Sequence, residues 1–170
     1  MRGFVATIFA LTLAVAGAVP VEANQGTVCR FDWEVLISPG LSMNPSSGTH
    51  RSAGPGTVDC DGLVNGKQPT GTGILEQEGL YGTTDPDSCM GGEGDGIDKL
   101  TIPTLGGIET VLSDFTFTFG GKLPTHGGVG AGEFKGTRFS GSFEITPIEG
   151  NCITAPVTKA RVFGEGVIHG

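Results

Sequence analysis

The sequence predicts an all-β protein whose strands form a single antiparallel β-barrel of about eight strands. Glycine supplies 31 of the 170 residues and recurs together with Thr, Ser and Pro, a composition that disfavours long helices. The segments between the glycines are rich in Val, Ile, Phe and Thr, and several alternate apolar with polar residues, as strands with one buried face do. A two-layer β-sandwich is the alternative. The barrel is favoured because glycines in strands near the carboxyl end help a sheet to curve and close.

Residues 1–23 have the three parts of a cleavable secretory signal peptide. These are Arg2, an uncharged apolar stretch over residues 4–19, and a small-residue cleavage site at residues 21–23. The apolar stretch is shorter than the roughly 20 residues that a spanning helix requires. We therefore expect residues 24–170 to form one secreted all-β domain, extracellular or in the cell envelope, without a membrane span.

Turn residues divide the amino-terminal half into strands. The first strand is expected over residues 29–37 and should stop at the turn-forming Ser38-Pro39-Gly40. Short strands at residues 49–53 and 57–60 flank Gly54-Pro55-Gly56. The pair Asn65-Gly66 predicts a tight turn before a further strand within residues 70–81.

The carboxyl-terminal half contains the clearest strand pattern. Residues 115–119 read Phe-Thr-Phe-Thr-Phe, which places three rings on one face of a strand, and this face should be core. Residues 129–145 predict a half-buried strand pair in which Gly141 shares a face with Phe139 and Phe143. A glycine at an inward position predicts close backbone approach or strong curvature. Residues 152–168 should supply the last strand or two.

Four cysteines follow the predicted cleavage site: Cys29, Cys60, Cys89 and Cys152. On an exported chain they are expected to form two disulfides, for which three pairings exist. Cys29 with Cys60 and Cys89 with Cys152 is favoured because each bond closes a loop of moderate length, although the other pairings stay open. The chain lacks the close cysteine pair of a typical zinc site.

An acidic, glycine-rich segment over residues 85–98 is the one metal candidate. Its carboxylates and glycines suit a calcium loop, because calcium takes six to eight oxygen ligands and glycine lets a loop fold tightly. The candidate ligands are Asp85, Asp87, Glu93, Asp95 and Asp98. The competing interpretation is a solvated acidic turn held by a disulfide at Cys89, and no other cofactor is indicated.

Other chemistry is poorly supported by the sequence. The formal net charge of −8 and the scattered cations argue against nucleic acid binding. Gly-x-Ser-x-Gly is absent, the three histidines lie in no metal-binding motif, and no catalytic residue is predicted. The single Trp33 and the single Tyr81 are expected to pack in the core, with a place in a ligand pocket as the alternative.

Several turn and cysteine motifs occur together along the chain. They are Ser38-Pro39-Gly40-Leu41, Pro45-Ser46-Ser47-Gly48-Thr49, Cys60-Asp61-Gly62, and the segment Gly150 to Thr158 around Cys152. In these the chain resembles a group of small exported actinobacterial proteins that have no assigned function. The resemblance implies a shared fold and export but no shared chemistry.

The sequence leaves three functions open, and fold class does not choose among them. The first is a non-catalytic exported domain that binds a small apolar ligand or an envelope partner, for which a cavity lined by phenylalanines would be evidence. The second is a barrel-type cyclase or isomerase, marked by a buried, unpartnered Asp or Glu. The third is a structural or surface-interaction protein with a filled core.

Overall fold

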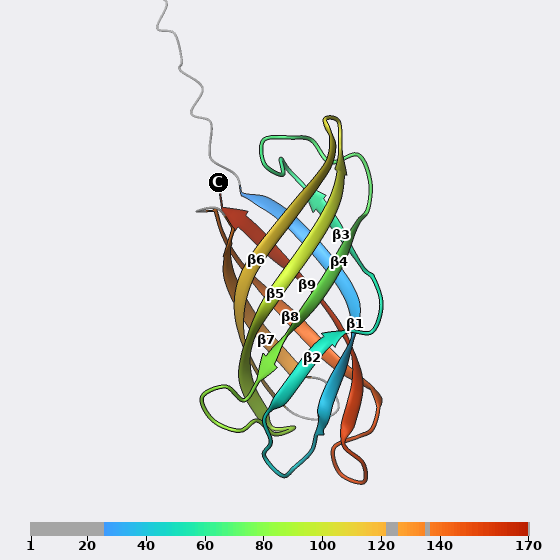
Figure 1. Cartoon of the computed structure of the whole chain (residues 1–170), viewed down its shortest axis with the longest axis vertical. Helices are drawn as coiled ribbons and strands as arrows, with labels where there is room; N and C mark the ends of the chain where they lie inside the picture. The colour runs from blue at the N-terminus through green and yellow to red at the C-terminus, as the bar shows by residue number, and fades with distance from the viewer. Residues whose placement is uncertain (1–25, 122–125, 135–136, 170) are drawn as a thin grey trace, which may run out of the picture.

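The computed structural model describes residues 26–121, 126–134 and 137–169, and they form one antiparallel sheet of nine strands (Figure 1). The predicted signal peptide, residues 1–23, lies outside the described residues. The strands are β1 (Thr27–Leu41), β2 (Gly48–Ser52), β3 (Gly56–Asp61), β4 (Gly73–Tyr81), β5 (Gly91–Thr104), β6 (Gly107–Gly120), β7 (His126–Phe134), β8 (Thr137–Glu149) and β9 (Val157–His169). Within these ranges, no helix is long and apolar enough to cross a membrane.

The sheet closes on itself because β1 pairs with β9 as well as with β2 and β3. Strands β2 and β3 lie end to end between β1 and β4, so the nine strands occupy eight positions of a closed ring. The remaining strands follow one another around the ring in chain order, as Figure 1 shows. The predicted barrel of about eight strands is confirmed, and the alternative of two separate layers is not adopted.

The prediction that the first strand stops at a turn over residues 38–40 is wrong, because β1 continues to Leu41. The register of β1 against β9 shifts between Leu36 and Leu41, and this irregularity accommodates Pro39, which has no N–H to donate to the ladder. The turn at Asn65-Gly66 is confirmed. Both residues have positive φ, 50° and 74°, and the Val64 N–H donates to the Lys67 carbonyl at 2.9 Å.

The prediction of a loop over the acidic segment, residues 85–98, is also partly wrong, because β5 begins at Gly91. The glycines of β5 pair with β6, the strand that contains the alternating phenylalanines. That alternation predicted β6 correctly, and Phe115 on its inward face is buried. A strand with strong β propensity thus imposes its conformation on a glycine-rich partner. Close backbone approach is confirmed at Gly141, where a Cβ atom would lie 2.9 Å from the Gly166 Cα.

Two disulfides are present in the pairing that loop length favoured, Cys29 with Cys60 and Cys89 with Cys152. The first joins directly opposite residues of β1 and β3, with Cα atoms 4.0 Å apart. The second joins the β4–β5 loop to the β8–β9 loop. Two groups of buried side chains surround these bonds, one cluster around each disulfide.

Candidate functional site

A cavity of about 510 Å³ lies inside the ring. Among the residues that the structure describes, six phenylalanines contribute to its wall: Phe31, Phe115, Phe117, Phe119, Phe139 and Phe143. A ring of eight positions is just wide enough to be filled by its own side chains or to hold one small ligand. The observed volume lies within the roughly 300 to 1,000 Å³ of typical small-molecule sites.

Glycines opposite the phenylalanine rings explain why the interior is not filled. Gly94 of β5 lies opposite Phe117, and Gly128 of β7 lies opposite Phe143. A Cβ atom would lie 2.5 Å from the Phe117 ring at the first glycine and 2.2 Å from the Phe143 ring at the second. Each ring therefore lies over the backbone of the neighbouring strand, and the centre of the ring of strands stays open.

Polar side chains cross one part of this apolar wall. Gln77 of β4 pairs in register with Asp98 of β5, and Asp98 pairs with Ser113 of β6. The Trp33 Nε1 donates a hydrogen bond to Gln77 Oε1 at 3.2 Å, which orients the Gln77 amide. All four side chains line the cavity, and we call Trp33, Gln77, Asp98 and Ser113 the polar row.

Asp98 is the exceptional member of the polar row. Its Oδ1 is buried and has no hydrogen-bond partner among the described residues. Burial raises the pKa of the carboxyl to about 7, although a hydrogen bond from the Gln77 side chain lowers it in part. Near neutral pH the group can therefore either donate or accept a proton, and one of its oxygens has an unused hydrogen-bonding capacity.

His50 of β2 is the second ionisable side chain brought into the interior. It is buried, its Nε2 lies 3.1 Å from the Asp95 carbonyl oxygen, and its ring meets Phe115 and Phe117 edge-on. Burial lowers the pKa of this imidazole, while the carbonyl contact acts in the opposite direction. The neutral form is favoured, so His50 adds little positive charge to the cavity.

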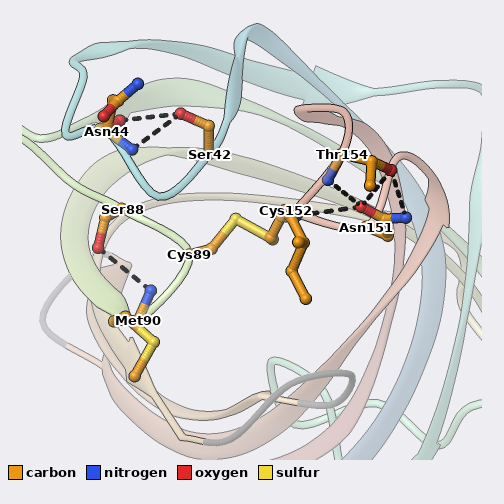
Figure 2. Close-up of a disulfide and its surroundings, with 9 residues drawn as sticks. Ser42, Asn44, Ser88, Cys89, Met90, Asn151, Cys152 and Thr154 are labelled. Atoms are coloured by element: carbon orange, nitrogen blue, oxygen red, sulfur yellow. Dashed lines mark hydrogen bonds between the residues drawn. A yellow bond between two sulfur atoms is a disulfide. The ribbon is translucent and has the colours of Figure 1, made fainter.

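One end of the cavity is bordered by the Cys89–Cys152 bond. Figure 2 shows this bond within the end of the ring, between the two loops that carry the cysteines. The Cys89 N–H donates to the Ser42 carbonyl at 2.8 Å, and the Asn151 side chain accepts the Thr154 N–H at 2.8 Å. The first bond ties the Cys89 loop to the residue that follows β1, the second shapes the Cys152 loop from within, and both cysteines are buried.

The five calcium candidates lie in different environments. Asp85 is exposed, and Asp87 is buried in the β4–β5 loop, where both its oxygens accept the Glu93 N–H at 3.1 Å. The Glu93 carboxylate accepts bonds from Thr83 and Thr84, Asp95 borders a hollow on the outer wall, and Asp98 lines the cavity. Among the described residues, no three His, Cys, Asp or Glu side chains converge to hold a metal ion.

The sequence predicts Asp98 in another role, as a calcium ligand of the acidic segment. Gln77 and Ser113 carry no local sequence signal, because only the strand register brings them beside Asp98. Trp33 and Tyr81 both line the cavity, the alternative considered for them, and both also pack with the buried cluster around Cys89–Cys152. No family model, curated protein or solved structure matches the chain.

Proposed function

We propose that the protein binds a small, mainly apolar molecule inside the ring of strands. The observation that supports this most is the cavity of about 510 Å³ with its phenylalanine wall. An unoccupied apolar space of this size sacrifices the packing contacts that normally stabilise a core. A ligand that fills it recovers those contacts and removes its own apolar surface from water.

Binding can be measured with the chain's own fluorophore. Trp33 is the single tryptophan and lines the cavity, so a molecule that enters should change its fluorescence. We would titrate the protein with adamantanol, a compact apolar body with one hydroxyl group. Native mass spectrometry of the same samples should show one added adamantanol per chain.

A blocking variant tests whether the probe enters the cavity. Gly130 lines it, and a Cβ atom there would come no closer than 3.4 Å to any neighbouring atom, so Gly130→Leu should place an apolar side chain in the open space without a clash at its base. The matched control is Val129→Leu on the outer face, where Val129 is 60% exposed. We expect at least a tenfold weaker affinity for Gly130→Leu and no change for the control. Equal affinity in both variants would remove the support for a binding cavity.

A second candidate, a barrel-type cyclase or isomerase, is favoured by one observation, the unpartnered oxygen of Asp98. A carboxyl whose pKa lies near the working pH is suited to general acid and base catalysis. The two candidates differ in what happens to the ligand. A molecule that copurifies with the protein and is returned unchanged after long incubation with fresh protein supports binding alone, whereas conversion to an isomer supports the enzyme.

We also infer that the protein works outside the cell or in the cell envelope. Two disulfides join all four cysteines, and such bonds persist in oxidising compartments. The predicted signal peptide and the resemblance to small exported actinobacterial proteins agree with this. Mass spectrometry of the protein recovered from culture medium, with a mature chain beginning at Asn24, is the test.

A further inference from the structure

We propose that Asp98 is the polar anchor of the cavity and selects apolar molecules that carry a hydrogen-bond donor, a hydroxyl or amine, over molecules that carry a carboxylate. This inference rests on the proposed binding function and specifies its ligand class. It follows from the position of Asp98, from the groups that orient it and from the charges that the wall lacks.

The geometry leaves one hydrogen-bonding position on Asp98 open. The carboxyl borders the cavity, Gln77 bonds to it from β4, and Oδ1 has no partner among the described residues. The terminal torsion of an aspartate is broad, so the carboxyl can turn to direct its open oxygen toward a donor. A donor on a bound molecule can thus satisfy the open carboxyl oxygen, and pairing a buried polar atom is favourable.

The remainder of the polar row limits how far the carboxyl can move. The Gln77 side chain is held by Trp33 Nε1, and its backbone N–H donates to Ser52 Oγ at 2.8 Å. Gln77 is therefore fixed at both its backbone and its side chain. We regard Gln77 as a positioning residue, because it holds Asp98 and is not required to touch the ligand.

The charges of the wall determine which ligands are disfavoured. Among the described residues that line the cavity there is no Lys or Arg, and the pKa of His50 is lowered by burial. A carboxylate ligand would find no cation to pair with and would face Asp98, so two like charges would be buried together. A hydroxyl or an ammonium group donates to Asp98 without that penalty.

Three probes with one apolar body separate these cases: adamantylamine, adamantanol and adamantane carboxylate. We would measure each affinity by Trp33 fluorescence and calorimetry at mildly alkaline pH, where Asp98 is ionised and the amine is still protonated. We expect the amine to bind at least tenfold more tightly than the carboxylate, with the alcohol between them, because a hydrogen bond to a charged group commonly contributes a ten- to hundredfold factor.

Variants connect this preference to Asp98. Asp98→Asn should weaken the amine about tenfold or more and leave the carboxylate equal or improved. Asp114→Asn removes the same charge from the exposed outer face of β6 and should change none of the three affinities. Equal affinity of the three probes for the unaltered protein, or an equal loss for all three in Asp98→Asn, would overturn the anchor while leaving cavity binding intact. If the unaltered protein binds no probe, the proposed function itself fails.

Discussion

The two ends of the ring are closed by different means. At the end where β1 begins, Val64 of the β3–β4 loop is 2% exposed and packs with Val58 and Ile102, while the disulfide there joins residues that are already strand partners. At the other end, the Cys89–Cys152 bond joins two loops that are not neighbours along the sheet. One end is thus closed by packing, and the other by packing together with a covalent bond between loops.

This difference between the two ends predicts where a ligand enters and leaves the cavity. Opening the end closed by Val64 requires buried apolar side chains to separate and meet water, which costs free energy in every opening event. The other end is held by the bond between Cys89 and Cys152 in addition to hydrogen bonds and buried apolar contacts, and breaking this bond would release two loops that are not neighbours along the sheet. We therefore expect ligand exchange at the Cys89–Cys152 end and expect it to be controlled by that disulfide.

The largest expected effect comes from replacing both cysteines of one disulfide at a time. The loops closed by Cys29–Cys60 and Cys89–Cys152 have sequence separations of 31 and 63. On the chain-entropy model, either double Cys→Ala variant should lose about 4 kcal/mol of unfolding free energy, slightly more for the longer loop. Urea denaturation of both variants measures this loss.

The two variants should differ clearly in ligand exchange. Removing Cys89–Cys152 should speed adamantanol dissociation at least fivefold, whereas removing Cys29–Cys60 should not, because the β1–β3 ladder remains. Stopped-flow fluorescence of Trp33 reports the rates. The same acceleration in both variants would show that the ends do not differ in the way we describe.

The second effect concerns Asp98, which lines the cavity between the two ends, and the dependence of stability on pH. The pKa of Asp98 is raised from 3.8 to about 7, so between these pH values the folded protein keeps a proton that the unfolded chain has lost. Stability should fall with rising pH by about 1.4 kcal/mol per unit in this window and then level off above it. Asp98→Asn removes this dependence and should be more stable than the unaltered protein by about 2 to 4 kcal/mol above neutral pH.

Urea denaturation of both proteins at pH values on either side of this window measures the effect. Other titrating groups, His50 among them, are common to the two proteins and cancel in the difference. The two stabilities should converge at acidic pH. A constant difference at all pH values would mean that water reaches the carboxyl freely and that neither end closes the cavity.

These regions also show how far the sequence could predict the protein. The alternation over residues 115–119 identified β6 and its inward face, because period two reports one buried side directly. The strand character of Gly91 to Asp98 could not be read locally, since glycine disfavours strands and only pairing with β6 imposes one. The polar row could not be predicted either, because Gln77, Asp98 and Ser113 meet only through the register of three strands.

The smallest effect, and the sharpest test of the packed end, is expected from Val64→Ala. Val64 is 2% exposed, so loss of two methyl groups and the space left behind should cost about 2 kcal/mol, while Leu63→Ala beside it, at a position 55% exposed, should cost less than about 0.5 kcal/mol. Thermal or urea denaturation measures both. Val64 also lines the cavity, so dissociation can change through lost ligand contact, and the association rate is the readout of the path. Adamantanol association should stay unchanged in Val64→Ala, because the ligand enters by the opposite end. Faster association in this variant would instead place the entrance at the β3–β4 loop and reverse the comparison between the two ends.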